Sequence, residues 1–491
     1  LTKKNPWVRG TININKQKYE IDIKLRGSHP SNWIDRNKMG YKIRLRKDQR
    51  YKGIKEFSIQ HPENREYIGE YLFMKILEKE GLIFSRSNFY NLNINGQNHG
   101  LYFFQESISK EMIENNKRRE SIIVGFDKEA HIEKYSNNLS ANENFNDVQL
   151  KDGFLVSEIN LSNSGRNFNK NKEKMFTNTF MMLDDFRSNR LNTSDVFDVD
   201  KLAKLMAIKA IFGAGEFDWR DIKFYYNPFN LKLEPIGKEV GAGLLSENDW
   251  WSSTPWEINY DINDTSQKSF LSLVFKDEVF FEKYLKELNY FVDNEKLILN
   301  KIIKEEEFQK NLTKIKINYP RRHKAFSIEM ISKNIKIIKE FLNAKNYVGF
   351  NLKEINDDTY IFSARNSLRL PVEVVGISFF GNEIFFDKKV VIPPRIVESK
   401  AKTNLFHIEL ENLKNNIDDF ENLKVLFNNR NEFRPDVNFL YKLEFSKEIY
   451  KSNIFTPKTY DKNFDIYKKK FLSSLKSIEN LYKIKENNII F

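Results

Sequence analysis

Four carboxylates gather around one turn-rich stretch of the chain, residues 213–243. Glu216, Asp218 and Asp221 lie close together in a Gly-rich turn, and Glu239 comes later, just before a second Gly-rich run. Carboxylates that are brought together repel one another unless a cation or a positively charged side chain lies among them. This pattern therefore predicts a divalent-metal site, provided that the fold returns Glu239 to the other three acids.

A predicted hairpin would bring Glu239 back to the other three acids. One strand is expected over 222–226 and a second over 231–236, with a tight Asn-Pro turn between them. The two strands of a hairpin bring their outer ends together. We therefore expect Glu239 to lie near Asp218 and Asp221, although it is far from them along the chain.

A basic face on an N-terminal sheet is the second feature that could do chemistry. Residues 7–26 are typical of a hairpin that ends in Arg26, and a loop that includes Lys38 leads to a third strand. Apolar and basic residues alternate over 41–46, so that Lys42 and the two arginines of this strand share one face. Two interpretations stay open: a solvated outer face, or a face that meets an anion.

Further elements complete this lobe. An amphipathic helix is predicted over 63–80, and strands over 88–95 and 99–106 are joined by an Asn-Gly pair, a strong hairpin signal. The last strand is apolar until it emerges at Gln105 and Glu106, where a sheet edge could meet a ligand. Residues 7–106 thus predict a mostly antiparallel sheet with a helix laid on it, an α+β lobe.

In the rest of the chain, the spacing of the apolar residues first predicts helices and then strands. Helices are predicted at 168–190, at 199–212 behind an N-cap, and two or three of them over 265–345. From about residue 346 the apolar pattern has period two, which favours short strands. The predicted domains are an α+β lobe (1–110), a helical lobe with the acidic hairpin (111–345), a β-sandwich-like accessory domain (346–455) and a polar helical tail (456–491).

The length and composition of the chain limit the classes of protein to which it can belong. At 491 residues the chain is too long for one ordinary core, and 40% hydrophobic residues leave ample material for several. No apolar run reaches the roughly 20 residues that a membrane span needs. The net charge of +12 suits an anionic partner, but the basic residues are dispersed among acidic ones, which favours a solvated surface over a nucleic-acid footprint. The absence of cysteine excludes disulfides and thiolate ligands and leaves the compartment open.

Common catalytic motifs are missing from the sequence. There is no Walker loop, dinucleotide-binding glycine fingerprint, paired-His zinc motif or Gly-x-Ser-x-Gly elbow, and the six histidines are scattered. A basic sheet face, an acidic hairpin and a helical body remain. That combination suits a phosphoanhydride, whose phosphates are held by positive side chains and whose bridging cation is held by carboxylates.

Three blocks of residues resemble a known family. The blocks are Arg26-Gly27-Ser28 with Lys38 and Tyr41-Lys42-Ile43, then Leu92-Asn93-Ile94-Asn95-Gly96 with Gly100-Leu101-Tyr102 and Glu106, then Asp221–Pro228 with Leu233-Glu234-Pro235-Ile236. In this order they are similar to the signature of the CotH kinase family, spore-coat proteins that are atypical, secretion-pathway-type protein kinases. The resemblance covers roughly residues 7–345.

The resemblance implies ATP-dependent phosphorylation of Ser or Thr on a protein, with Mg²⁺ or Mn²⁺. By position, Lys42 would contact the nucleotide phosphates, with Arg26 and Lys38 nearby, and Glu106 would lie on the adenine side. Asp218 or Asp221 would be the catalytic acid. Asp221, Glu239 and Glu216 would hold the metal.

Two acids depart from the family pattern. The family usually has Asp where this chain has Glu239, and Asn where it has Asp221. The ungapped alignment places Glu216 rather than Asp218 at the usual acidic position, so the choice between these two stays open. Both substitutions keep oxygen ligands, which favours a working or altered metal site over a dead one.

Our leading hypothesis is an α+β, atypical kinase-like two-lobe domain followed by a β-sandwich-like domain, acting on a protein substrate. The alternative is a catalytically inactive CotH-like surface or coat assembly protein. Nucleic-acid binding through the basic surface is a third, weaker hypothesis. An extracellular or cell-surface location is favoured over a cytoplasmic one, and the acceptor protein, the oligomeric state and a signal or anchor before Leu1 cannot be inferred from these residues.

Overall fold

The chain divides into two compact units, the first made of Leu1–Ile258 with Ile262–Lys339 and the second mainly of Glu340–Phe491. Each unit is described by itself. The computed structural model describes residues 5–26, 38–127, 154–155, 157–162, 169–214, 219, 222–244, 270–320, 328–342, 348–356, 359–366, 371–379, 382–392, 404–411, 437–443, 448–455 and 481–483.

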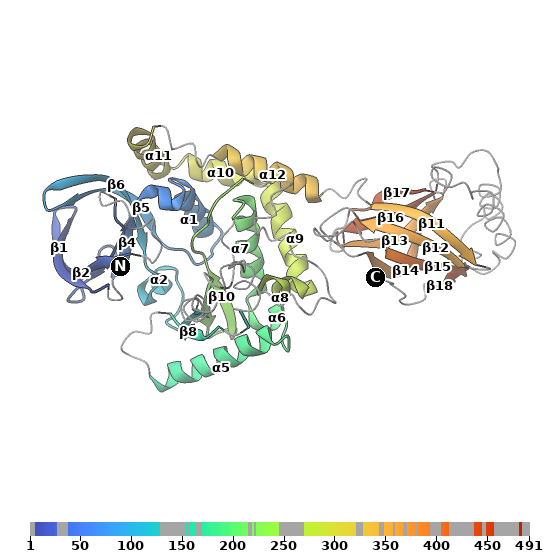
Figure 1. The fold of residues 1–491 in the computed structure, drawn as a ribbon, viewed down its shortest axis with the longest axis horizontal. Coiled ribbons are helices and arrows are strands. Elements are labelled where there is room, and N and C mark those ends of the chain that lie inside the picture. Colours follow the sequence, from blue (N-terminus) through green and yellow to red (C-terminus); the bar gives the residue numbers. More distant parts are fainter. Residues whose placement is uncertain are drawn as a thin grey trace, which may run out of the picture. The chain divides into compact units, whose positions relative to one another are not determined.

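The first unit begins with a six-stranded antiparallel sheet in the order β1-β2-β3-β4-β6-β5 (Figure 1). Its strands are β1 (Val8–Ile14), β2 (Gln17–Leu25), β3 (Tyr41–Leu45), β4 (Glu56–Gln60), β5 (Ser87–Ile94) and β6 (Gln97–Glu106). A 3₁₀ turn, η2 (Pro62–Arg65), and helix α1 (Gly69–Lys79) lie between β4 and β5 in the chain. We call these elements together the sheet lobe.

The two faces of this sheet differ in character. One face carries a buried apolar cluster to which both edges of the sheet contribute, so the sheet curves into a half-barrel around it; its members include Ile21, Ile43, Phe57, Tyr102 and Phe104. The opposite face presents Lys42 of β3, opposite Lys24 of β2 and Ser58 of β4. The predicted alternation of apolar and basic residues is therefore what separates core from polar face.

The sequence predicted both hairpins of the sheet lobe. Left-handed Asn15 and Lys16 join β1 to β2, and left-handed Asn95 with Gly96 joins β5 to β6, as two-residue hairpin turns require. The helix expected over 63–80 is shorter. Glu66 and Tyr67 adopt left-handed backbone angles that separate the 3₁₀ turn from α1. Strand β4 was not predicted, because its five residues are too short for a clear period.

A second, four-stranded antiparallel sheet in the order β10-β9-β7-β8 holds the acidic hairpin. Its strands are β7 (Ile123–Phe126), β8 (Ile159–Leu161), β9 (Lys223–Asn227) and β10 (Lys232–Ile236). The register pairs Ile236 with Lys223, so the chain leaves β10 at the same end of the hairpin at which it enters β9. The predicted hairpin is thus confirmed.

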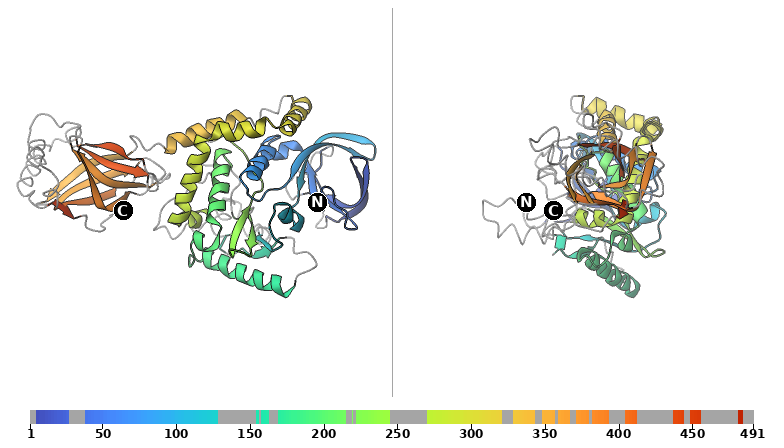
Figure 2. Two further views of the ribbon diagram at one scale, coloured as in Figure 1. Left: turned by 180° about the vertical axis from the view of Figure 1, so that it is seen from behind. Right: turned by 90° about the vertical axis from the view of Figure 1, so that its right-hand side faces the viewer.

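Helices make up most of the remaining first unit, which we call, with this second sheet, the helical lobe. They are α2 (Lys110–Asn115), α5 (Lys170–Arg187), α6 (Thr193–Val196), α7 (Val199–Ile211), α8 (Phe270–Lys276), α9 (Glu278–Asp293), α10 (Glu295–Ile303), α11 (Glu306–Asn318) and α12 (Ile328–Leu342). The Asp198 side chain caps α7 by accepting from the Lys201 N–H, as predicted. Helices α7 and α9 pack side by side (Figures 1 and 2).

A buried carboxylate ties this lobe together. Glu234 of β10 is fully buried, and its two oxygens are 2.5 Å from Arg118 Nη2 and 3.0 Å from Lys201 Nζ. Arg118 also donates to the Gly81 carbonyl, just after α1. Hairpin, α7 and the end of α1 are therefore joined through one side chain.

The second unit is an eight-stranded sheet in the order β14-β13-β16-β17-β11-β12-β15-β18. Its strands are β11 (Val348–Asn356), β12 (Thr359–Asn366), β13 (Val372–Phe379), β14 (Asn382–Ile392), β15 (Asn404–Glu411), β16 (Val437–Leu443), β17 (Tyr450–Phe455) and β18 (Leu481–Lys483). All pairs are antiparallel except β11 with β17. Phe362 of β12 packs on Phe439 of β16 with ring centroids 5.0 Å apart, although these strands are not neighbours, so the sheet curls around a shared core.

The tail differs from its prediction. Leu481–Lys483 form a strand rather than a helix, because they pair with Leu410 and its neighbours at the open edge of β15. The rest of the tail lies outside the described residues, and the finer division into four domains stays a prediction. None of the helices in the described parts of the chain is long and apolar enough to cross a membrane.

Removing one partner of the buried Glu234 cluster tests its role. Arg118→Met leaves the carboxylate with Lys201 alone, and we expect a loss of about 3 kcal/mol in the free energy of unfolding, measured by urea denaturation. Arg119→Met is the matched control, because this neighbour is exposed and lies over the Phe229 ring. Equal effects of the two variants would contradict the assignment.

Candidate functional site

The site is built on a loop that runs from β10 across to the end of α7, residues 237–243, which we call the junction loop. At its start the Gly237 N–H donates to the Ile83 carbonyl at 2.9 Å. A Cβ at Gly237 would lie 2.0 Å from Leu77 Cδ1 and 3.1 Å from the Ile83 carbonyl oxygen, so the loop passes so close to α1 that a larger residue would force Leu77 to shift.

The far end of the junction loop is fixed in the same way. Gly243 N–H donates to the Phe212 carbonyl at 3.0 Å, and Asn334 Nδ2 of α12 donates to the Gly243 carbonyl at 2.9 Å. Gly213, which ends α7, has φ +59°, and a Cβ there would lie 2.3 Å from the Gly243 oxygen. The loop is therefore held at both ends by close backbone approach.

Three cations surround the carboxylate of Glu239 in the middle of this loop. Arg65 Nη2 donates to Glu239 Oε1 at 2.6 Å, and Arg26 Nη2 and Lys238 Nζ each lie 3.5 Å from the same oxygen. Glu239 has φ +35°, a conformation that costs a non-glycine residue free energy. Lys209 Nζ of α7 donates to its carbonyl at 2.8 Å, so side chain and backbone are both held.

A second carboxylate fixes the backbone next to Glu239. Glu70 of α1 is fully buried. Its Oε2 accepts from the Val240 N–H at 2.8 Å, and its Oε1 accepts from Gln105 Nε2 of β6 at 3.1 Å. Helix α1, the sheet and the junction loop thus meet at one side chain.

The electrostatic balance at this junction is positive. Among the described residues, four cations (Arg26, Arg65, Lys209 and Lys238) face two carboxylates, Glu70 and Glu239. Burial and, after it, the charge of Arg65 lower the pKa of Arg26 to about 10, while Glu239 and Glu70 act in the opposite direction. Arg26 therefore remains charged at neutral pH, and the junction suits an anion.

Of the predicted site residues that the structure describes, Arg26 and Glu239 lie in contact. Lys42 instead pairs with Glu56 across the sheet at 2.6 Å, and Arg44 binds the same carboxylate at 2.9 Å. Burial acts to raise the pKa of Glu56, but these two cations outweigh it and hold the pKa below its usual value.

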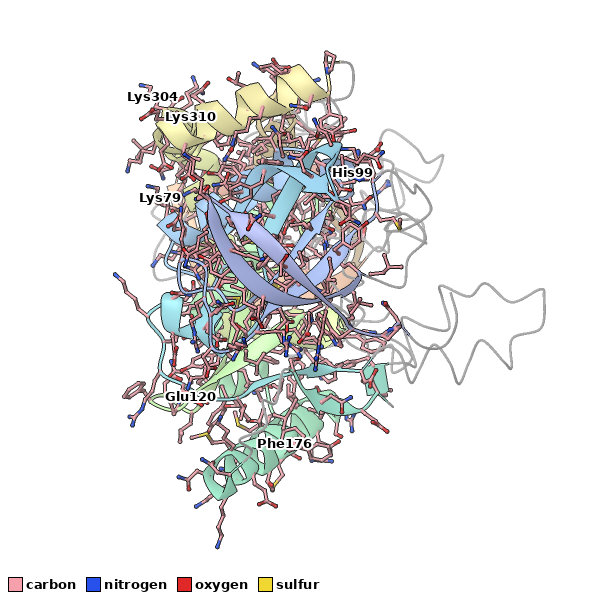
Figure 3. The ribbon with its side chains drawn as sticks, turned by 90° about the vertical axis from the view of Figure 1, so that its left-hand side faces the viewer. Lys79, His99, Glu120, Phe176, Lys304 and Lys310 are labelled. Carbon is pink, nitrogen blue, oxygen red and sulfur yellow. The ribbon has the colours of Figure 1, made fainter. Side chains whose placement is uncertain are left out.

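Lys38 and Glu106 also have partners within the protein. The Lys38 ammonium donates to the carbonyls of His99 and Leu101 in the β6 hairpin and lies 5.0 Å from the Tyr102 ring centroid; His99 is labelled in Figure 3. The buried Glu106 carboxylate accepts from Arg86 Nε and Nη2, each at 2.8 Å. A nucleotide contact by either residue would require these bonds to be exchanged.

The remaining predicted acids, Glu216, Asp218 and Asp221, lie outside the described residues. Within the described part of the chain there is no group of three or more His, Cys, Asp or Glu side chains that could hold a metal. Glu239 by itself does not fit a divalent cation, because guanidinium groups already neutralise its carboxylate. The described residues therefore fit the phosphates of a nucleotide but not its metal.

Sequence reasoning missed Arg65, Glu70 and Lys209. A faint signal existed for two of them. Glu70 and Lys209 are single charged residues within apolar helix faces, and a buried charge needs a partner. The partner itself, on a loop distant in sequence, could not be identified in that way.

The model of one protein family, described as CotH kinase protein, matches residues 23–363. The chain belongs to the CotH kinase family. The predicted family is thus confirmed, and the match covers the whole junction from Arg26 to Glu239 and continues into β11 and β12 of the second unit. No curated protein matches the chain.

The close glycine contact at the end of the junction loop is testable. Gly213→Ala introduces both a left-handed alanine and a clash with the Gly243 oxygen, so we expect it to lower the free energy of unfolding by about 2–4 kcal/mol. Gly81→Ala is the matched control, because Gly81 has φ +72° but open space around its Cβ position. Its loss should be about 1 kcal/mol. Equal losses in thermal or urea unfolding would contradict the close approach.

Proposed function

We propose that this CotH kinase family member is an active protein kinase that transfers the γ-phosphate of ATP to Ser or Thr of a protein. In this proposal the first unit is an atypical kinase-like domain with two lobes, and the β-sandwich-like second unit is an accessory module. The observation that carries it is the cationic junction of Arg26 and Arg65 around Glu239, where the two lobes meet. Family membership implies a kinase-like protein that uses ATP.

The proposed roles follow from charge and position. Arg26 neutralises phosphate oxygens at the junction, and Lys42 does so on exchanging Glu56 for the nucleotide. The acceptor hydroxyl gives its proton to Asp218 or Asp221 as its oxygen bonds to the γ-phosphorus, and the bond to the bridging oxygen breaks to release ADP. Mg²⁺ or Mn²⁺, when bound, supplies further neutralisation of the phosphates. Glu216, Asp221 and Glu239 would hold the cation, Glu239 only after its carboxylate is released from Arg26 and Arg65.

An inactive CotH-like scaffold is the second candidate function. It is favoured by one observation, the engagement of the Glu239 carboxylate by two arginines and a lysine, which leaves it poorly placed for a cation. In either case we propose an extracellular or cell-surface location, as the resemblance to spore-coat proteins implies.

Phosphoryl transfer decides between the two. With radiolabelled ATP and Mn²⁺ or Mg²⁺, the wild-type chain should label itself or a generic protein acceptor. Asp221→Ala and Glu239→Ala should lower the rate about 100-fold or more, since each removes a group that acts on the transferring phosphate. Glu120→Ala is the control, because Glu120, labelled in Figure 3, is exposed. Its carboxylate pairs with Lys110 and Lys172.

Absence of transfer by the wild type, or equal transfer by the acidic variants, would contradict the kinase proposal. The scaffold candidate then predicts no rise in the unfolding temperature with ATP and Mn²⁺, because only ligands that bind the native state stabilise it.

A further inference from the structure

The buried side chain of Gln60 and the partly buried side chain of Arg26 lie at one end of the sheet, next to the junction. Arg26 follows Lys24 by two residues and Gln60 follows Ser58 by two, so both lie on the polar face that carries Lys42. The Arg26 N–H donates to the Gly40 carbonyl at 2.9 Å, and Gly40 directly precedes β3, the strand between β2 and β4. Arg26 and Gln60 therefore flank a residue that has no side chain.

Both side chains have buried atoms with unmet hydrogen-bonding capacity. Gln60 is completely buried, and neither its Nε2 nor its Oε1 has a partner in the described part of the chain; the same holds for Arg26 Nη1. An unmet buried polar group is destabilising, so proteins rarely retain one without a ligand, water or ion to satisfy it.

The other terminal nitrogen of Arg26 already faces an anion, the Glu239 carboxylate, 3.5 Å away. Arg65 binds the same oxygen at 2.6 Å. The strained φ of Glu239 and the tight loop ends show that the fold holds this carboxylate against the arginines. A phosphate group, which offers more acceptor oxygens than a carboxylate, can accept from two guanidinium groups and an amide donor together.

We infer that Arg26, Arg65 and Gln60 form a phosphate site that Glu239 occupies in the ligand-free protein, and that a phosphoanhydride displaces this carboxylate without needing a divalent cation. The guanidinium groups supply the neutralisation that a metal would otherwise supply, and Gln60 Nε2 donates to a phosphate oxygen. This inference rests on the proposed function only in taking a nucleotide as the natural source of the phosphates.

Binding in the absence of metal tests this. Isothermal titration in excess EDTA would use sodium pyrophosphate, ATP and inorganic phosphate as separate probes. We expect wild-type protein to bind pyrophosphate and ATP, and Arg26→Gln to weaken both at least about tenfold by removing a charge-assisted contact. Arg190→Gln is the matched control, since this arginine is exposed on the helical lobe. Inorganic phosphate that binds as tightly as pyrophosphate would show a site for a free anion and overturn the phosphoanhydride assignment.

Glu239→Gln gives the most specific expectation. Neutralising the resident carboxylate should tighten pyrophosphate binding in EDTA about three- to tenfold, because the competitor for the arginines is lost. The same substitution should weaken phosphoryl transfer in Mn²⁺, since Glu239 is a proposed metal ligand. Tighter pyrophosphate binding together with slower phosphoryl transfer would distinguish the role of Glu239 as a competitor for the arginines from its role as a metal ligand.

Gln60→Leu separates binding from folding. Because its amide has no partner, replacing it with an apolar side chain of similar size should leave the unfolding temperature unchanged or raise it. Pyrophosphate affinity should nonetheless fall about tenfold, through loss of the donor to a charged oxygen.

The inference is overturned if pyrophosphate binds only with Mn²⁺ or Mg²⁺, if Arg26→Gln or Gln60→Leu binds as the wild type does, or if Glu239→Gln weakens binding in EDTA. Metal-dependent binding with normal phosphoryl transfer would overturn this inference and leave the kinase proposal standing. Pyrophosphate binding in EDTA without any phosphoryl transfer would contradict the kinase proposal and support this inference.

Discussion

The contact between two arginines of the sheet lobe and one carboxylate of the junction loop organises the first unit. Arg26 and Arg65 reach Glu239 from the end of β2 and from the 3₁₀ turn before α1. Partly buried charges of this kind add little net stability, because desolvation offsets their attraction, but they strongly disfavour arrangements that leave one of them unpaired. The pairing therefore specifies how the loop lies against the sheet.

Neighbouring interactions make this arrangement robust. Glu70 binds the backbone at Val240, and Lys209 binds the carbonyl of Glu239, so α1 and α7 hold the loop from opposite lobes. The chain belongs to the CotH kinase family, and in the proposed kinase reaction this junction would hold the phosphates of ATP. A surplus of positive charge where two lobes meet is what a phosphate-transferring protein needs, whichever additional groups complete the site.

Local signals in the sequence were sufficient for most of the fold. Asn95-Gly96 and the alternation in β2 and β3 predicted hairpins that the structure contains. Short strands such as β4 and β7 were not predicted, because four or five residues are too few to show a period. Strand β18 was not predicted because it depends on pairing with β15, which is distant in the sequence. For the site, the predicted hairpin is present, whereas the expected approach of Glu239 to Asp218 and Asp221 stays a prediction, because those two acids lie outside the described residues. The Glu56 partner of Lys42 and the Glu70 contact with Val240 depend on tertiary packing that no local pattern encodes.

The two glycine anchors of the junction loop also bear on kinetics. Because its backbone is hydrogen-bonded at Gly237 and at Gly243, a movement of the loop away from the arginines would have to break these contacts. Exchange of the Glu239 carboxylate for another anion must then proceed by rotation about side-chain bonds. Rotamer changes take picoseconds to nanoseconds at exposed positions and are slower when packed, whereas loop and lid openings take microseconds or longer. The entry of an anion should accordingly be paced by its own diffusion and desolvation, not by opening of the protein.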